Sequence, residues 1–297
     1  MTRLLATGLL LICLGLPATG QAAVWVDAMN RPVELTAPPQ RVVSLVPSVT
    51  EILFALGAGD QLVGATRFCT YPPAARDLPR VGDYSEPSLE AIAVLAPDLV
   101  VLAADAASPA LLARIEALDI AAYVVYPKGI TGTVATIRQL GGVVGQAAAA
   151  ERLASELQLK IDTIRQTSQS HHKPRVLFCV MTEPLVVAGP GTLIDDLLQA
   201  AGASNVVQTG PVRYPTWGAE ALLAADPDIL ILSVHPGQQG PDELMATWPE
   251  LRASRDRQVV TVEADWVSRP GPRLALGAQA LAEIFQHWAT AQGKASP

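Results

Sequence analysis

The sequence contains little of what enzymes commonly use for chemistry. It has four histidines, and no His-Glu-x-x-His, Gly-x-Ser-x-Gly or Gly-x-x-x-x-Gly-Lys motif occurs. Carboxylates are plentiful, but no close pair stands apart from ordinary surface charge, so glycosidase-like acid/base catalysis has no support. An enzyme remains a distant alternative, because catalytic residues can lie far apart in a sequence.

Long apolar runs are absent except at the amino terminus. Arg3 supplies a positive start, Leu4 to Leu16 an apolar run, and the small residues up to Ala23 a cleavage region. This pattern predicts a secretory signal peptide over residues 1–22, cut after Ala22 or Ala23, because the run is too short for a membrane span. Cys13 follows Ile12 inside the apolar run, which disfavours a lipid anchor. We expect export to the periplasm, with no direct membrane insertion.

Cysteine and positive charge are also scarce. Without Arg3, 20 of the 21 basic residues remain against 28 acidic ones, a net charge of −8. That balance argues against nucleic acid and anionic membrane surfaces as partners. Cys69 and Cys179 fall in different predicted lobes, and Cys179 lies in an apolar run, so we expect two separate thiols. Two cysteines cannot build a four-thiolate zinc or iron–sulfur site.

One sequence pattern occurs twice. Residues 90–102, Glu-Ala-Ile-Ala-Val-Leu-Ala-Pro-Asp-Leu-Val-Val-Leu, recur at 220–232 as Glu-Ala-Leu-Leu-Ala-Ala-Asp-Pro-Asp-Ile-Leu-Ile-Leu. Each copy predicts a short helix with an acidic first turn, stopped before proline and followed by a buried strand. Such duplication indicates two similar α/β lobes, with a ligand site in the cleft between them.

The order of elements supports this interpretation. Strand-like runs alternate with helical segments, which is typical of mostly parallel sheets covered on both faces; the runs are 41–45, 61–66, 98–103, 122–125, 175–180 and 259–262. From Thr131 to Gln169 helical spacing continues without a strand, which predicts a long helix joining the lobes. We therefore expect a first lobe over 23–128, a linking long helix over 129–170 and a second lobe over 171–297.

Aromatic residues stand beside turn residues. Tyr71 precedes two prolines, Tyr84 lies before the first repeated helix, and Tyr214 and Trp217 lie before the second. Tyr84 and Tyr214 each stand six residues before their repeat glutamate, so they are expected to face each other across the cleft. Opposed rings suit a large, flat, partly apolar ligand. The alternative interpretation is that the rings only pack loops onto the hydrophobic core.

A polar cluster follows the last strand. Asp265, Trp266 and Arg269 precede the final helix, and the prolines that follow place Arg269 in a loop. Asp265 and Arg269 either form a surface pair, worth less than ~1 kcal/mol, or present donors and acceptors to amide or phosphate groups of a ligand. Their place at the mouth of a strand favours the second interpretation.

These motifs together resemble a known family. The carriers of the resemblance are Arg41-Val-Val-Ser-Leu-Val-Pro-Ser-Val-Thr-Glu-Ile-Leu, Tyr71-Pro-Pro, Val81-Gly-Asp-Tyr, Ser88-Leu-Glu-Ala-Ile, Pro97-Asp-Leu-Val and Asp265-Trp-x-x-Arg-x-x-Pro-Arg. They resemble the periplasmic binding proteins that feed ABC importers for cobalamin, iron siderophores and haem, over nearly the whole mature chain. The fold implied is two α/β lobes joined by a helical backbone, and Tyr71-Pro-Pro and the last stretch are most similar to cobalamin-binding members.

The resemblance implies a role for particular residues. Ser48, Tyr71, Tyr84, Tyr214, Asp265 and Arg269 are expected to line the ligand cleft, with Trp217 and Trp266 beside them. Tyr84 and Tyr214 stand where the cobalamin-binding members use tryptophan, which retains ring stacking. Haem-binding members place tyrosine directly after Val-Gly, whereas Asp83 intervenes here. Haem and ferric siderophore remain the alternative ligands.

The repeat glutamates also acquire an implied role. Glu90 and Glu220 match positions that in this family dock onto arginines of the membrane permease, although first-turn acids also complement the helix dipole, for ~0.3–1 kcal/mol each. The sequence therefore predicts a non-enzymatic, monomeric solute-binding protein without a cofactor or metal of its own. It is expected to capture a corrinoid and deliver it to an ABC importer.

Overall fold

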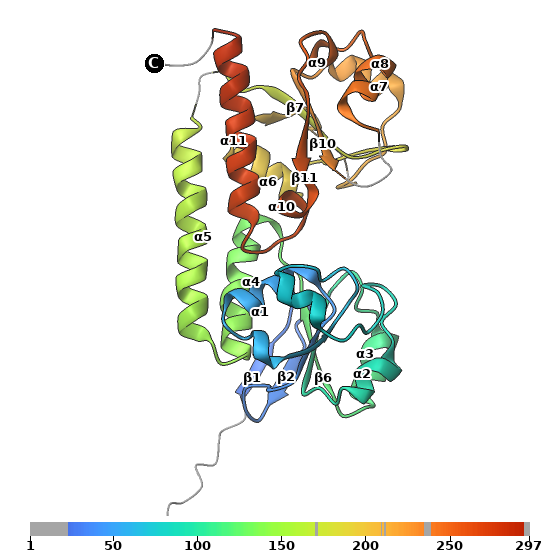
Figure 1. Cartoon of the computed structure of the whole chain (residues 1–297), viewed down its shortest axis with the longest axis vertical. Helices are drawn as coiled ribbons and strands as arrows, with labels where there is room; N and C mark the ends of the chain where they lie inside the picture. The colour runs from blue at the N-terminus through green and yellow to red at the C-terminus, as the bar shows by residue number, and fades with distance from the viewer. Residues whose placement is uncertain (1–22, 170–171, 209, 211, 235–238, 294–297) are drawn as a thin grey trace, which may run out of the picture.

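The computed structural model describes residues 23–169, 172–208, 210, 212–234 and 239–293, and the expected signal peptide lies outside this part of the chain. Two α/β lobes are stacked along the long axis of the molecule, with helices alongside both (Figure 1). The α/β class, the two lobes and their mostly parallel sheets are confirmed.

The first lobe is built on a four-stranded parallel sheet of order β4-β3-β5-β6. A β1–β2 hairpin, absent from the sequence-based prediction, packs against β6. The strands are β1 (Ala23–Val26), β2 (Pro32–Leu35), β3 (Val42–Ser44), β4 (Leu62–Ala65), β5 (Leu99–Ala103) and β6 (Ala121–Val125). The helices are α1 (Pro47–Ala55), the 3-10 turns η1 (Gly59–Gln61) and η2 (Pro73–Asp77), α2 (Leu89–Val94) and α3 (Pro109–Glu116).

The second lobe has a five-stranded sheet of order β11-β10-β7-β8, in which β9 also pairs with β7 and only β8 is antiparallel. Its strands are β7 (Arg175–Thr182), β8 (Leu185–Val187), β9 (Ser204–Asn205), β10 (Ile229–Val234) and β11 (Val259–Glu263). Its helices are α6 (Leu193–Ala200), α7 (Ala219–Ala225), α8 (Pro241–Thr247), α9 (Arg252–Arg255), α10 (Ala264–Ser268) and α11 (Leu274–Ala291).

One hydrophobic core runs through both lobes. Successive strand residues point to opposite faces of a sheet, so Val42 and Val101 enter this shared core while Val43 and Val100 enter a separate outer core of the first lobe. The second lobe repeats the arrangement with its own outer core. The shared core also contains residues of α1, α4, α5, α6 and α11, so the inner faces of the two sheets are held in one packed unit.

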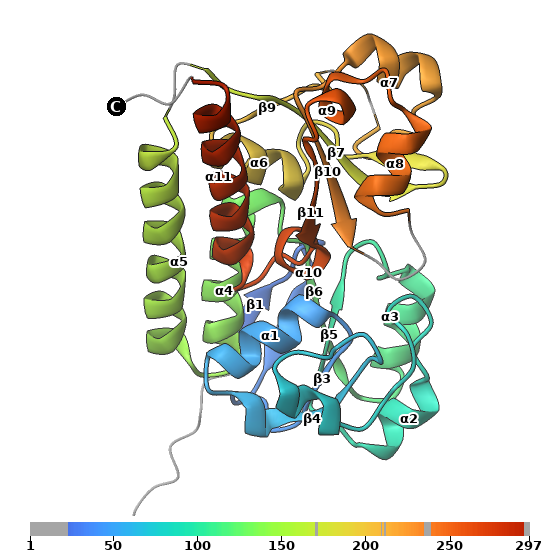
Figure 2. The same cartoon turned by 45° about the horizontal axis from the view of Figure 1, so that its top comes forward.

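The single linking helix predicted over 129–170 is corrected by the structure. The stretch forms two helices, α4 (Gly129–Val143) and α5 (Ala147–Thr167), joined by a tight turn at 144–146. Gly145 adopts φ +77°, a left-handed conformation that glycine accepts readily. A side chain on Gly141 would meet Ala150, so small residues allow α4 and α5 to pack closely. In Figure 2, α5 runs beside α11 and extends along both lobes.

The repeated sequence forms the same local structure twice. Asp98 accepts the backbone N–H of Arg41 at 2.9 Å, and Asp228 accepts that of Arg175 at 2.9 Å. Each arginine then donates from its guanidinium to carbonyl oxygens at the C-terminal end of α2 or α7. The Pro-Asp step of the repeat therefore ties a helix end to the start of a neighbouring strand in both lobes.

The lobes also touch through the first turn of α4. Asp196 of α6 accepts the backbone N–H of Ile130 at 3.1 Å, which satisfies an unpaired donor of the helix. Gly129 adopts φ +62°, and a Cβ there would collide with the Asp196 carboxylate. Among the residues that the structure describes, no helix combines the length and hydropathy of a membrane span.

Candidate functional site

A cavity of about 540 Å³, called the cleft here, lies between the lobes. Residues after β3, β5 and β6 form its first-lobe wall, and the loop before α7 and the segment around α10 form its second-lobe wall. It is therefore at the carboxyl ends of parallel strands, where α/β sheets usually bind ligands. Five predicted site residues line it together: Ser48, Tyr84, Tyr214, Asp265 and Arg269.

Three predicted site residues do not line the cleft. Tyr71 lines a different cavity, on the other side of the loop that joins α10 to α11. Trp217 packs against the outer core of the second lobe, and Trp266 packs against the shared core. The turn residues beside Tyr71 and Trp217 indicated a loop position, but they did not indicate the direction in which the ring points.

Tyr84 is held by a partner that the sequence did not reveal. Its hydroxyl donates a hydrogen bond to Asp105, which follows β5 and also lines the cleft. Burial, this hydrogen bond and the Asp105 charge raise the pKa of Tyr84 far above its ordinary value. Burial also raises the pKa of Tyr214. Both phenols are therefore neutral at neutral pH.

A second pair spans the cleft from lobe to lobe. Arg213 Nη1 donates to the Tyr126 hydroxyl oxygen at 3.2 Å, and its Nη2 donates to the Gly191 carbonyl at 2.8 Å. The Lys128 ammonium lies 5.0 Å from the centre of the Tyr126 ring. Sequence analysis missed Tyr126, although it directly follows a predicted strand. Two cations near one phenol give this side of the cleft a positive character.

The predicted Asp265–Arg269 pair belongs to a larger arrangement, called the ion network here, which also contains Glu51 and Arg273. Arg269 Nε lies 2.8 Å from Asp265 Oδ1, and Arg273 Nη2 lies 3.3 Å from Asp265 Oδ2. Glu51 of α1, with a side chain 2% exposed, accepts from Arg273 Nη2 at 2.6 Å and pairs with Arg269 at 3.4 Å. Two carboxylates and two guanidinium groups therefore join the lobes and compensate each other.

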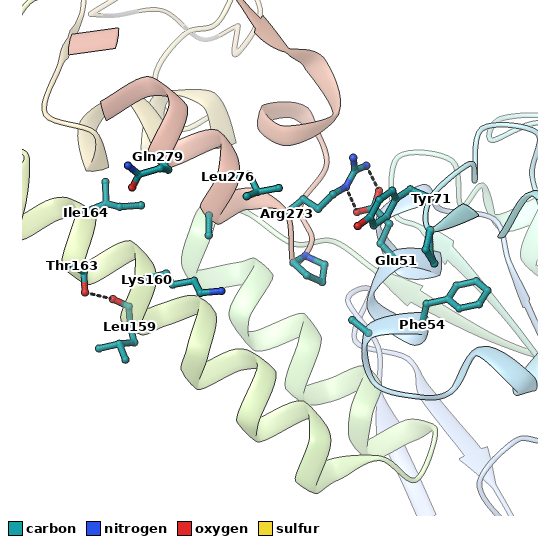
Figure 3. A pocket seen from close by; sticks show the side chains of 14 residues that line it. Glu51, Phe54, Tyr71, Leu159, Lys160, Thr163, Ile164, Arg273, Leu276 and Gln279 are labelled. Atoms are coloured by element: carbon teal, nitrogen blue, oxygen red, sulfur yellow. Dashed lines mark hydrogen bonds and ion pairs between the residues drawn. The ribbon is translucent and has the colours of Figure 1, made fainter. Parts of the chain in front are cut away.

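The ion network separates the cleft from a second cavity. Asp265 and Arg269 line the cleft, whereas Glu51 and Arg273 line a hollow of about 830 Å³ on the other side, called the rear groove here. Figure 3 shows it between α1, α5 and α11, with the Tyr71 ring beside the Arg273 guanidinium. The lining residues are Glu51, Phe54, Ala55, Tyr71, Pro72, Leu159, Lys160, Thr163, Ile164, Pro272, Arg273, Ala275, Leu276 and Gln279.

The two repeat glutamates lie on exposed helix starts. Glu90 is in the first turn of α2 and Glu220 in the first turn of α7, one on each lobe. Figure 1 shows α2 and α7 on the side of the molecule opposite α5. Neither glutamate lines the cleft.

The described part of the chain contains two cysteine thiols and no cluster of metal-ligating side chains. Cys69 and Cys179 are both free and buried, which agrees with the prediction of separate thiols. Burial raises the pKa of the Cys179 thiol to about 12. Within the described ranges, no three His, Cys, Asp or Glu side chains gather in a way that would hold a metal ion.

Several known proteins resemble this chain in sequence and in fold. The sequence model of a family described as "Periplasmic binding protein" matches residues 42–265. The vitamin B12-binding protein of Pectobacterium carotovorum is 31% identical over 258 residues, covering 86% of this chain and 91% of that protein. The solved vitamin B12 binding protein of Vibrio cholerae is 26% identical, with a TM-score of 0.75 over 84% of this chain and 98% of that one. A haem-binding protein of a Roseiflexus species is 29% identical, with a TM-score of 0.77 over 84% and 99%.

Proposed function

The chain belongs to the periplasmic binding protein family, and we propose that it captures cobalamin in the cleft and delivers it to the permease of an ABC importer. The family consists of solute-binding proteins rather than enzymes. The observation that carries the cobalamin proposal is the meeting, in one cavity, of tyrosines from opposite lobes with the Asp265–Arg269 pair. Curated relatives named for vitamin B12 support it.

The chemistry of a corrinoid fits this lining. Cobalt arrives already held by the corrin ring, so recognition depends on the flat ring, its peripheral amides and the nucleotide phosphate. Tyr84 and Tyr214 offer ring surface and neutral hydroxyl groups. Asp265 can accept from amides, while Arg269 and Arg213 can donate to amide or phosphate oxygens. The cleft, at about 540 Å³, is smaller than a whole cobalamin, so we expect part of the ligand to project into solvent.

Haem is the second candidate, and one contact favours it. Haem iron takes an axial ligand from the protein, commonly tyrosinate or histidine. Arg213 donates a hydrogen bond to the Tyr126 hydroxyl oxygen, so this oxygen already serves as an acceptor at the wall of the cleft. Tyr84 is the poorer ligand, because it donates its own proton to Asp105 and its pKa is raised. For a ferric siderophore, the cleft offers no comparable specific contact among the described residues.

Delivery is the second half of the proposal. In the periplasm, Glu90 and Glu220 would meet basic pockets of the permease, one contact per lobe. Their exposure and their separation from the cleft support a role in docking rather than in capture. A docking surface with one carboxylate on each lobe also fixes the orientation of the binding protein on its partner.

An ultraviolet–visible spectrum tests the ligand. The protein is incubated separately with cobalamin, haem and a ferric siderophore, and each sample is then desalted. We expect cobalamin absorption to remain at one equivalent, unchanged in Tyr126→Phe. If the unaltered protein retains haem and not cobalamin, and if haem is lost in Tyr126→Phe but kept in Tyr84→Phe, haem replaces cobalamin as the proposed ligand. Retention of only the siderophore would contradict both assignments.

A further inference from the structure

The rear groove is a second concave site between the lobes, and the family function assigns nothing to it. At about 830 Å³ it lies within the size range of small-molecule sites, and it is larger than the cleft. Its walls come from α1 and the Tyr71 loop, from α5, and from α11. Rigid helices therefore form most of it, and the shared core fixes their spacing.

Most of the lining is apolar and open to solvent. Leu159 is 67% exposed, Leu276 is 49% exposed and Tyr71 is 44% exposed, although all three are large hydrophobic or aromatic side chains. Phe54 and Ile164 add further apolar surface. Gathered hydrophobic exposure of this kind in a hollow marks a binding site more often than scattered single residues do.

The charges of the lining leave one cation unpaired. Arg273 and Glu51 compensate each other through hydrogen bonds of 2.6 and 2.8 Å. Lys160 takes part in none of the ion pairs among the described residues. Figure 3 shows its side chain pointing from α5 into the groove. The groove thus presents apolar walls and a single free positive charge, on a chain whose net charge is −7.

The hollow is also elongated. Gln279 of α11 lines both the rear groove and a smaller neighbouring cavity of about 260 Å³, which continues between α5 and α11 toward His172. The rear groove itself lies along two adjacent helices, which suits a flexible chain better than a broad ring, whereas the neighbouring cavity is lined by polar side chains such as Ser168 and Glu283.

We propose that the rear groove binds a single-chain amphiphile with one carboxylate, such as a fatty acid, with the acyl chain along α5 and α11 and the carboxylate at Lys160. The alkyl chain covers Leu159, Leu276 and Ile164, which favours binding in proportion to the apolar area removed from water. Lys160 supplies a charge-assisted hydrogen bond to the carboxylate. The site is independent of the ligand that the cleft takes.

Isothermal titration with dodecanoate below its micelle concentration tests the proposal. We expect one saturable site, weakened at least about tenfold by Leu276→Asp, because a carboxylate would then face the alkyl chain, and several-fold by Lys160→Glu. Leu223→Asp, on exposed α7, and Arg114→Glu, on α3, are the matched controls and are expected to change affinity less than twofold. Tyr84→Ala is expected to retain dodecanoate binding, because that residue lies in the cleft.

Several outcomes would overturn the proposal. These are non-saturable uptake, equal losses in the control variants, or loss of binding in Tyr84→Ala, which would place dodecanoate in the cleft. Gel filtration of the unaltered protein and of Leu276→Asp tests whether a second copy of the chain occupies the groove instead. If the unaltered protein is a dimer and this variant is a monomer, a second copy covers the groove. Cobalamin retention is measured on the same variants. A variant that loses dodecanoate binding but retains cobalamin shows that the rear groove and the cleft are separate sites.

Discussion

At the scale of single residues, the proposed capture of cobalamin depends on rings from opposite lobes. Replacing Tyr84 or Tyr214 by alanine is expected to weaken cobalamin binding by ~1–3 kcal/mol, because each removes a desolvated aromatic contact. Tyr71→Ala is the matched control: the residue is 44% exposed, against 42% for Tyr214, but it lies in the rear groove. Titration of cobalamin, with thermal unfolding of the ligand-free variants, gives the measurement. Equal losses of affinity in all three variants would contradict the assignment of the cleft.

A second residue-scale prediction concerns the thiols. Burial raises the pKa of Cys179 from 9.0 to about 12, so the folded state favours the neutral thiol. Its contribution to stability is therefore complete below pH 9 and is lost as the pH rises toward 12. In the chain without residues 1–22, we expect no rapid reaction of the folded protein with a thiol reagent at pH 8, and two reactive thiols after unfolding in denaturant. Finding none after unfolding would reveal a disulfide.

The sequence identified some site residues and missed others for a physical reason. Tyr84 and Tyr214 were found because each precedes a repeated helix by the same interval, and the fold places equivalent loops at the same cleft. Glu51 lies 222 residues from Arg273 in the sequence, and no local sequence pattern predicts a contact at that separation. Trp217 was misplaced because a turn fixes the backbone, whereas packing decides which side of the loop the ring covers.

At the scale of elements, strands were easier to predict than helix ends. Buried parallel strands are continuous apolar runs, and β3 and β5 have only buried residues. The turn between α4 and α5 was missed because the helical spacing of apolar residues resumes directly after it. Val143 and Ala150 both enter the shared core, so the pattern looks continuous although the chain reverses direction.

The element-scale prediction tests this reversal. Gly145→Ala is expected to lower the free energy of unfolding by ~1–2 kcal/mol, because alanine is strained at φ +77°. Gly145→Asn places the same Cβ near Pro38 but tolerates the left-handed conformation better, so it should lose less. Urea unfolding of the three proteins measures the difference. Identical losses in the two variants would assign the cost to the Pro38 contact rather than to the backbone conformation.

At the scale of the whole molecule, the shared core and the ion network both resist separation of the lobes. Glu51→Gln is expected to destabilise the protein by about 3 kcal/mol, because it leaves two largely buried guanidinium groups with one carboxylate. Glu151→Gln is the matched control, since its pair with Arg138 is exposed and screened by solvent. Denaturant unfolding compares them. A loss for Glu51→Gln no larger than that of the control would show that the network contributes little to joining the lobes.

The proposed docking on the permease also concerns the whole molecule, because Glu90 and Glu220 lie on different lobes. Exchanging both for lysine is expected to leave cobalamin affinity unchanged, since neither residue lines the cleft. Transport into proteoliposomes that contain the importer is expected to collapse, because repulsion then replaces attraction at both ends of the docking surface. Each single exchange is expected to give an intermediate rate, with a defect that depends on ionic strength.

The matched control for this experiment is the double exchange of Glu156 and Glu283 for lysine. Both glutamates are exposed, and they lie on α5 and α11, so the change in net charge is the same on a different surface. If the position of the charge decides docking, this control transports at nearly the rate of the unaltered protein. Equal defects in the two double variants would indicate that net charge alone matters. Normal transport by the Glu90 and Glu220 variant would leave these residues with only their stabilising effect on α2 and α7.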